Sequence, residues 1–104
     1  MKNYELQITT EEVNDTSIRF ILDGHVDSIN ANILERKLED ALRVGKTQIT
    51  VNMSNVKYLI STGIRVLLSI YKKAAKSGCT FRIEKPSENV VNVLGMTALD
   101  EMLL

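Results

Sequence analysis

The sequence contains no tryptophan, one proline, one histidine and one cysteine among its 104 residues. A single cysteine, Cys79, cannot form an intramolecular disulfide, so a disulfide-stapled scaffold is excluded. Cys79 also has no cysteine or histidine near it in sequence, and we therefore expect no metal site. Three tyrosines and two phenylalanines are too few to suggest the base-stacking platforms of single-strand nucleic-acid binders.

The sequence also has no excess of positive or negative charge. Thirteen basic and thirteen acidic residues cancel, which argues against direct, non-specific nucleic-acid binding. No apolar run approaches the roughly 20 residues that a membrane span needs. The first residues are polar and do not form the apolar core of a signal peptide. We therefore expect a cytoplasmic protein without a direct membrane contact.

The residues that are present predict one globular α/β domain over 1–104, because 44% are hydrophobic and their spacing alternates between the periods of strands and helices. The predicted strands span 4–10, 17–22, 47–53 and 79–84, and the predicted helices span 31–44, 62–76, 88–94 and 98–104. Strands that alternate with helices indicate right-handed crossovers and a mostly parallel sheet. The first two strands form an antiparallel hairpin, so the sheet is mixed, with four helices in all.

Three further predictions concern where a strand, a loop and a helix end. Asp23 and Gly24 are expected to stop the second strand. Residues 54–60 are predicted to form a connecting loop, with Val56, Tyr58 and either Leu59 or Ile60 turned inward. Gly95 is expected to end the helix over 88–94.

Ser61 lies where a helix is expected to begin, and a serine there suits the N-cap position. Helix N-termini favour anions, because their N–H groups are unpaired and the helix dipole is positive there. A phosphate on Ser61 would therefore be tolerated, and Gly63 would let another surface approach closely. The apolar stripe of this helix is expected to consist of Ile64, Leu67, Leu68, Tyr71 and Ala75. We interpret this stretch as a phosphorylatable docking site.

Several segments resemble the STAS domain family, which contains bacterial anti-sigma factor antagonists. Residues 24–27 are similar to the family's G-x-(I/L/V)-D pattern, and residues 52–64 to its N/D-L-S-x-V-x-Y-(M/I)-D-S-(S/T)-G-L signature. Residues 77–78, 81–83 and 90–96 resemble the following turn, strand and C-terminal region. The resemblance covers nearly the whole chain in the family's order and spacing.

This resemblance implies a mixed-sheet domain without enzymatic activity. It implies that the protein binds an anti-sigma factor that is also a serine kinase. The kinase would phosphorylate Ser61 and so dissociate the pair, and a phosphatase would restore binding. No cofactor is implied.

One departure from the family pattern keeps an alternative open. Ile60 stands where the family has an aspartate, and an isoleucine can neither accept a hydrogen bond nor assist proton transfer. This favours a STAS module that is not switched, serving as a scaffold or as the soluble subunit of a transport complex.

The predicted partner-binding residues are Asp27, Ser61, Thr62, Gly63 and Arg65. Arg65 opens a polar helix face that continues through Ser69, Lys72 and Lys76, and that face is typical of a solvated surface as well as of a docking surface. A hydrolase with Ser61, His25 and Asp27 as its catalytic triad is disfavoured. Ser61 is not in a G-x-S-x-G elbow, and His25 and Asp27 are too close in sequence for the usual triad geometry.

Overall fold

The structure is a computed structural model, and it describes residues 6–96 and Leu103. Its elements follow the order β1 (Leu6–Glu12), β2 (Ser17–Val26), α1 (Ala31–Arg43), β3 (Gln48–Leu59), α2 (Ser61–Ser77), β4 (Thr80–Glu84) and α3 (Glu88–Met96). The described residues hold three helices where the sequence predicted four. The fourth, over 98–104, lies outside the described residues except for Leu103, whose side chain is buried.

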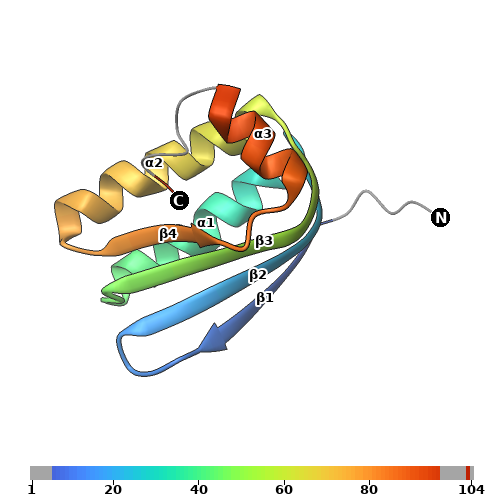
Figure 1. The fold of residues 1–104 in the computed structure, drawn as a ribbon. Coiled ribbons are helices and arrows are strands. Elements are labelled where there is room, and N and C mark those ends of the chain that lie inside the picture. Colours follow the sequence, from blue (N-terminus) through green and yellow to red (C-terminus); the bar gives the residue numbers. More distant parts are fainter. Residues whose placement is uncertain (1–5, 97–102, 104) are drawn as a thin grey trace.

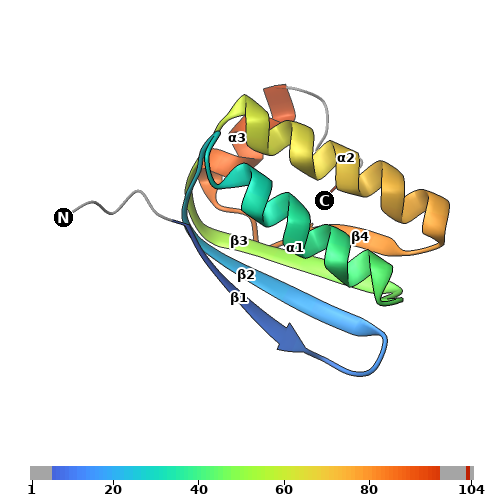
Figure 2. The same ribbon diagram turned by 180° about the vertical axis from the view of Figure 1, so that it is seen from behind.

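The four strands form one sheet in the order β1-β2-β3-β4. β1 pairs antiparallel with β2, while β2 with β3 and β3 with β4 pair in parallel. The predicted mixed, mostly parallel sheet with an N-terminal hairpin is therefore confirmed. Both parallel connections cross on the same side, so α1 and α2 cover one face of the sheet, as Figures 1 and 2 show from opposite sides.

The core lies between this sheet face and the helices. Its largest fully buried side chains are Phe20, Leu22, Leu34, Leu38, Ile49, Met53, Leu67, Ile70, Leu94 and Leu103. In α1 the buried positions are Ala31, Leu34, Leu38 and Ala41. Ile33, an apolar residue of the same helix, is 49% exposed.

The apolar stripe of α2 is rotated relative to the prediction. Its buried residues are Gly63, Val66, Leu67, Ile70 and Ala74, so that only Leu67 is shared with the predicted stripe. Ile64 and Tyr71 are half-buried at the flank. Apolar residues occupy nearly every position from 63 to 71, and spacing alone therefore cannot choose between two adjacent stripes; packing against the sheet decides.

β2 does not stop at Asp23 and Gly24 but continues to Val26, so that prediction is wrong. Gly24 is buried and has φ of +123°, a backbone conformation that other residues rarely adopt. A register shift relative to β3 follows directly, between Gly24 and His25. The glycine therefore lets an irregular strand continue where the sequence suggested a turn.

β3 is likewise longer than predicted, since residues 54–59 are strand rather than loop. Two register shifts each leave one extra residue on β3: Ile21 and Asp23 pair with Asn52 and Asn55, and a second shift follows before Tyr58. Such bulges change the spacing of buried side chains from two residues to three. Met53, Val56 and Leu59 are accordingly buried, whereas Tyr58 is 58% exposed rather than turned inward.

α3 takes the place beside β3 that β4 leaves empty. β4 ends at Glu84, paired with Asn52. Beyond that point the N–H group of Ser87 donates to the carbonyl oxygen of Met53 at 3.1 Å, and its hydroxyl donates to the carbonyl of Val56 at 2.7 Å. The Ser87 hydroxyl also caps α3, because it accepts a bond from the N–H group of Val90 at 3.3 Å. α3 runs through Gly95 to Met96, so the predicted end at Gly95 is wrong.

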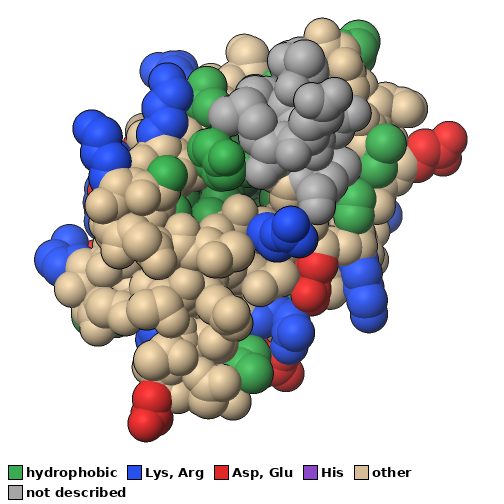
Figure 3. All heavy atoms as spheres, turned by 60° about the vertical axis from the view of Figure 1, so that its left-hand side comes forward, with side chains coloured by type: hydrophobic (Ala, Val, Ile, Leu, Met, Phe, Trp, Pro, Cys, Tyr) green, Lys and Arg blue, Asp and Glu red, His purple; other side chains and the backbone are tan. Residues whose placement is uncertain are grey.

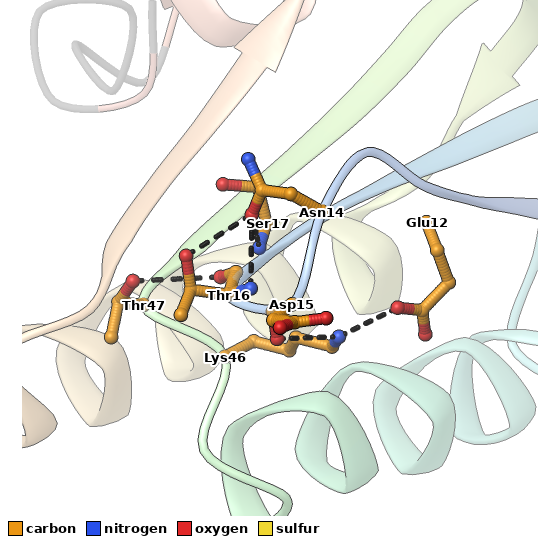
Figure 4. A network of polar contacts seen from close by, with 7 residues as sticks. All are labelled: Glu12, Asn14, Asp15, Thr16, Ser17, Lys46 and Thr47. Atoms are coloured by element: carbon orange, nitrogen blue, oxygen red, sulfur yellow. Dashed lines mark hydrogen bonds and ion pairs between the residues drawn. The ribbon is translucent and has the colours of Figure 1, made fainter.

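Polar contacts tie the β1–β2 hairpin to the loop before β3, at the amino ends of β2 and β3 and opposite the carboxyl ends of these two strands (Figure 4). Asn14 Oδ1 accepts a hydrogen bond from the N–H group of Ser17 at 3.0 Å and so closes the turn. Lys46 Nζ lies 2.8 Å from Glu12 Oε1 and 3.1 Å from the carbonyl oxygen of Asp15. These contacts hold the hairpin against the body of the domain.

Candidate functional site

The carboxyl ends of β2 and β3 bring Asp27 and Ser61 to one edge of the sheet. Val26, the last residue of β2, pairs with Leu59, the last residue of β3. The N–H group of Ile60 then donates a hydrogen bond to the carbonyl oxygen of Val26 at 3.3 Å. Asp27 and Ser61 each follow one member of this bonded pair. The carboxyl ends of parallel strands are where α/β folds place their sites.

Ser61 is the first residue of α2, and the N-cap position is occupied by Ile60. Ile60 has an extended backbone, with φ of −92° and ψ of 175°, and its carbonyl oxygen accepts the N–H group of Ile64 at 3.1 Å. The prediction that Ser61 caps the helix through its side chain is therefore wrong. A residue at the first helical position already has a helical backbone, so its hydroxyl points away from the N–H groups that a cap would bond.

The Ser61 side chain is consequently open to its surroundings. The residue is exposed, and none of the described residues forms a hydrogen bond with its hydroxyl group. It stands at the positive end of a 17-residue helix. A second protein can reach this hydroxyl without displacing any internal contact of the described chain.

Gly63 contributes by packing inside the domain. It is buried, and a Cβ atom added there would lie 2.7 Å from Val26 Cγ1 and 2.7 Å from Leu59 Cδ1. The surface that approaches this glycine is therefore the chain's own strand ends, which fixes the start of α2 over β2 and β3. Thr62 is half-buried and Arg65 is exposed on the same helix. The roles of these three residues in partner binding stay predictions.

Asp27 and Asn30 bond one another's backbone. Asp27 Oδ1 accepts hydrogen bonds at 2.9 Å from the N–H groups of Ile29 and Asn30, and Asn30 Oδ1 accepts one at 2.9 Å from the N–H group of Asp27. The carbonyl oxygen of Asp27 accepts the N–H group of Ala31 at 3.0 Å. This reciprocal arrangement is that of a capping box one turn before α1. Asn30 occupies the N-cap position of α1 without bonding the helix through its side chain.

Exposed apolar side chains at this edge were missed by the sequence interpretation. Ile29 is 80% exposed, Tyr58 58% and Ile60 40%. The Tyr58 ring meets the His25 ring edge-on, with centroids 4.7 Å apart and an interplanar angle of 88°. The sequence did contain a signal for this exposure, because Tyr58 and Ile60 lie on either side of Leu59, which is buried. The bulges of β3 interrupt the alternation of buried and exposed residues, and this signal was therefore not recognised. Tyrosine is among the residues that are enriched in protein–protein interfaces.

The described residues contain no group of three His, Cys, Asp or Glu side chains that could hold a metal ion. Over the same residues, every helix is too short or too polar to cross a membrane. The site is therefore built from an exposed hydroxyl, a helix N-terminus and apolar side chains.

Comparisons with known proteins agree with this geometry. The chain is 26% identical over 90 residues to the anti-sigma-B factor antagonist of Bacillus subtilis (strain 168), covering 86% of this chain and 82% of that protein. The structure of the anti-sigma factor antagonist SpoIIAA in its unphosphorylated form superposes with a TM-score of 0.80 at 22% identity, over 94% of this chain and 86% of that one. The phosphorylated form of SpoIIAA, from Bacillus, gives a TM-score of 0.73 at 20% identity, over 94% and 89% of the two chains.

A model of the STAS domain family matches residues 7–104, which is nearly the entire chain and includes both strand ends and the start of α2. The mixed-sheet fold and the family match agree with one another, and the chain belongs to the STAS domain family.

Proposed function

We propose that this protein is an anti-sigma factor antagonist, a regulator without enzymatic activity that binds an anti-sigma factor with serine kinase activity. Binding uses the edge formed by Asp27, Ser61, Thr62 and Arg65, and phosphorylation of Ser61 switches it off until a phosphatase removes the phosphate. The observation that carries the proposal is the exposed Ser61 hydroxyl at the first position of α2, beside exposed Ile60.

The physical reason for a switch is the different cost of a phosphate in the free and the bound protein. A phosphate carries about 1.5 to 2 negative charges at neutral pH. In the free protein the N-terminus of α2 and water stabilise that charge. In a complex the same charge would have to lose its water against the apolar surface of Ile60 and Tyr58, which is unfavourable. Phosphorylation therefore weakens binding without unfolding the domain.

The name of the Bacillus subtilis relative, an anti-sigma-B factor antagonist, supports this class of function. The alternative is a STAS module that binds without being switched, as a scaffold or as the soluble subunit of a transport complex. Ile60 favours this alternative, since it places an apolar side chain where a carboxylate would otherwise stand next to the serine.

The decisive experiment combines labelling with binding. Each serine kinase-type anti-sigma factor of the host is purified and mixed with the full chain and labelled ATP. We expect a label on Ser61 that is lost in Ser61→Ala and kept in Thr62→Ala, the neighbouring hydroxyl serving as the matched control. Ser61→Asp is expected to lower affinity for the same kinase about tenfold or more, with an unchanged circular dichroism spectrum.

Two results would contradict the switch. If a kinase binds the protein tightly but never labels it, and Ser61→Asp binds as the wild type does, the unswitched alternative holds. If none of the anti-sigma factors binds, the antagonist function itself is wrong.

A further inference from the structure

The neutral composition conceals a strong separation of charge along the chain. Residues 41–83 contain no acidic residue and eight basic ones: Arg43, Lys46, Lys57, Arg65, Lys72, Lys73, Lys76 and Arg82. α2 lies inside this range, so that all of its charged side chains are positive. Figure 3, which views the domain from a direction turned by 60° from that of Figure 1, shows Lys and Arg side chains gathered at the upper left of this face.

The exposed side of α2 forms a ridge that begins at Ser61. Arg65, Leu68, Lys72 and Lys76 follow Ser61 at spacings of four, three, four and four residues, which place all five on one face of a helix. Arg65, Lys72 and Lys76 are exposed and Leu68 is half-buried. This face lies opposite the buried stripe of α2. We call these five residues the α2 ridge.

No acidic residue in the described part of the chain neutralises the cations of the α2 ridge. Lys73, on the flank that faces α1, donates a hydrogen bond to the carboxylate of Glu39, and this bond raises the pKa of Lys73. By contrast, no acidic side chain among the described residues lies within ion-pair distance of Arg65, Lys72 or Lys76. Over residues 6–96, the ridge therefore carries three exposed positive charges that have no ion-pair partner.

The position of the ridge indicates what would cover it. It starts at the hydroxyl that the proposed kinase must reach, next to the exposed side chain of Ile60. An apolar centre with a charged margin is the usual anatomy of a protein–protein interface. A lipid surface fits less well. The apolar face of α2 is buried in the core and cannot enter a bilayer, and three cations alone contribute only about 1 kcal/mol each near anionic lipid.

We propose that the α2 ridge docks against an acidic surface of the protein that engages Ser61. This inference rests on the proposed function, because it describes the chemistry of that same partner. Opposite charges on the two surfaces would raise the association rate and set the orientation of the complex. A phosphate on Ser61 would stand one helical turn from Arg65, about 6 Å along the helix axis, and would reduce the positive potential of the ridge.

The first test measures affinity for the anti-sigma factor at low and at high ionic strength. The doubly reversed variant Lys72→Glu/Lys76→Glu is compared with Arg36→Glu/Lys37→Glu, a reversal of two exposed cations on α1 that changes the net charge by the same amount. We expect the ridge variant to bind about tenfold more weakly at low salt, with the difference shrinking as salt screens the charges. The α1 variant is expected to change affinity less than about twofold. Equal affinity for the ridge variant and the wild type would overturn the ridge proposal while leaving the proposed function intact.

The second test does not need the anti-sigma factor. A peptide of ten glutamates is titrated into the isotope-labelled protein at low salt, and amide chemical shifts are recorded. Shifts that are confined to the α2 ridge and absent in the ridge variant are expected, whatever the fate of the antagonist function. If instead the peptide shifts nothing and vesicles of anionic phospholipid bind the wild type but not the ridge variant, the ridge is a lipid-binding surface and the proposal is wrong.

Discussion

The N–H group of Ile60 donates a hydrogen bond to the carbonyl oxygen of Val26, 3.3 Å away, and this bond joins the ends of β2 and β3. The next residue after each partner is a predicted site residue, Asp27 after Val26 and Ser61 after Ile60. Because Asp27 and Ser61 directly follow the two partners of this hydrogen bond, their relative position is set by the sheet rather than by a flexible loop.

Gly63→Ala should destabilise the protein. Alanine favours a helix over glycine by about 1 kcal/mol, but its Cβ would lie 2.7 Å from both Val26 Cγ1 and Leu59 Cδ1. Overpacking of a core costs about 1–3 kcal/mol, so we expect a net loss of about 1 kcal/mol in a urea titration. Gly95→Ala is the matched control, because no atom of the described residues lies within 4 Å of a Cβ added there in α3. It should gain about 0.5–1 kcal/mol, and a loss in both variants would contradict the packing explanation.

Asp27→Ala should lower the free energy of unfolding by about 1 kcal/mol, the usual value of a lost helix cap. The reason is that the N–H groups of Ile29 and Asn30 lose their acceptor. Asp27→Asn keeps an acceptor oxygen in that place and should retain most of the stability. Thermal unfolding of the two variants beside the wild type measures the difference.

The same Asp27→Asn variant separates the capping role from partner binding. It removes the negative charge and leaves the loop folded. If Asp27 also contacts the partner, affinity for the anti-sigma factor should fall although stability does not. Unchanged affinity would limit Asp27 to holding the loop between β2 and α1.

Ser87→Ala should cost about 1–2 kcal/mol, because one hydroxyl both donates to the carbonyl oxygen of Val56 and caps α3 at Val90. Without it, the carbonyl on the free edge of β3 loses its partner and α3 loses its cap. Ser54→Ala is the comparison: its exposed hydroxyl bonds only Asn52, at 2.8 Å. That change should stay within about 0.5 kcal/mol. Equal losses in chemical denaturation would argue against a special role for Ser87.

Cys79 should react slowly with alkylating reagents in the folded protein. Its side chain is buried, and burial raises the pKa of the thiol, so little reactive thiolate is present at neutral pH. The folded state therefore favours the protonated thiol, and raising the pH should speed the reaction. We expect alkylation to accelerate about tenfold or more once denaturant unfolds the chain. Mass spectrometry of quenched samples follows the rate, and equal rates with and without denaturant would contradict the burial.

Spacing by itself determined the order of the elements, the mixed sheet and the position of Ser61 at the start of a helix. These follow from local periods of two and 3.6 residues and from short connections, which every part of the chain carries in its own sequence. The family signature over 52–64 is likewise local, because it lies within one continuous stretch of the sequence. The end of α2 at Gly78, with φ of +74°, is also a local property of a glycine.

Tertiary structure alone decided the details that shape the site. The bulges of β3 change the spacing of buried residues from two to three, and only pairing with β2 reveals where the extra residues lie. That pairing turned the predicted loop at 54–59 into strand and exposed Tyr58. The close packing of Gly63 on Val26 joins residues that are far apart in the chain, and it sets which face of α2 is buried. Contacts between distant segments depend on how the whole chain closes, and no local pattern records them.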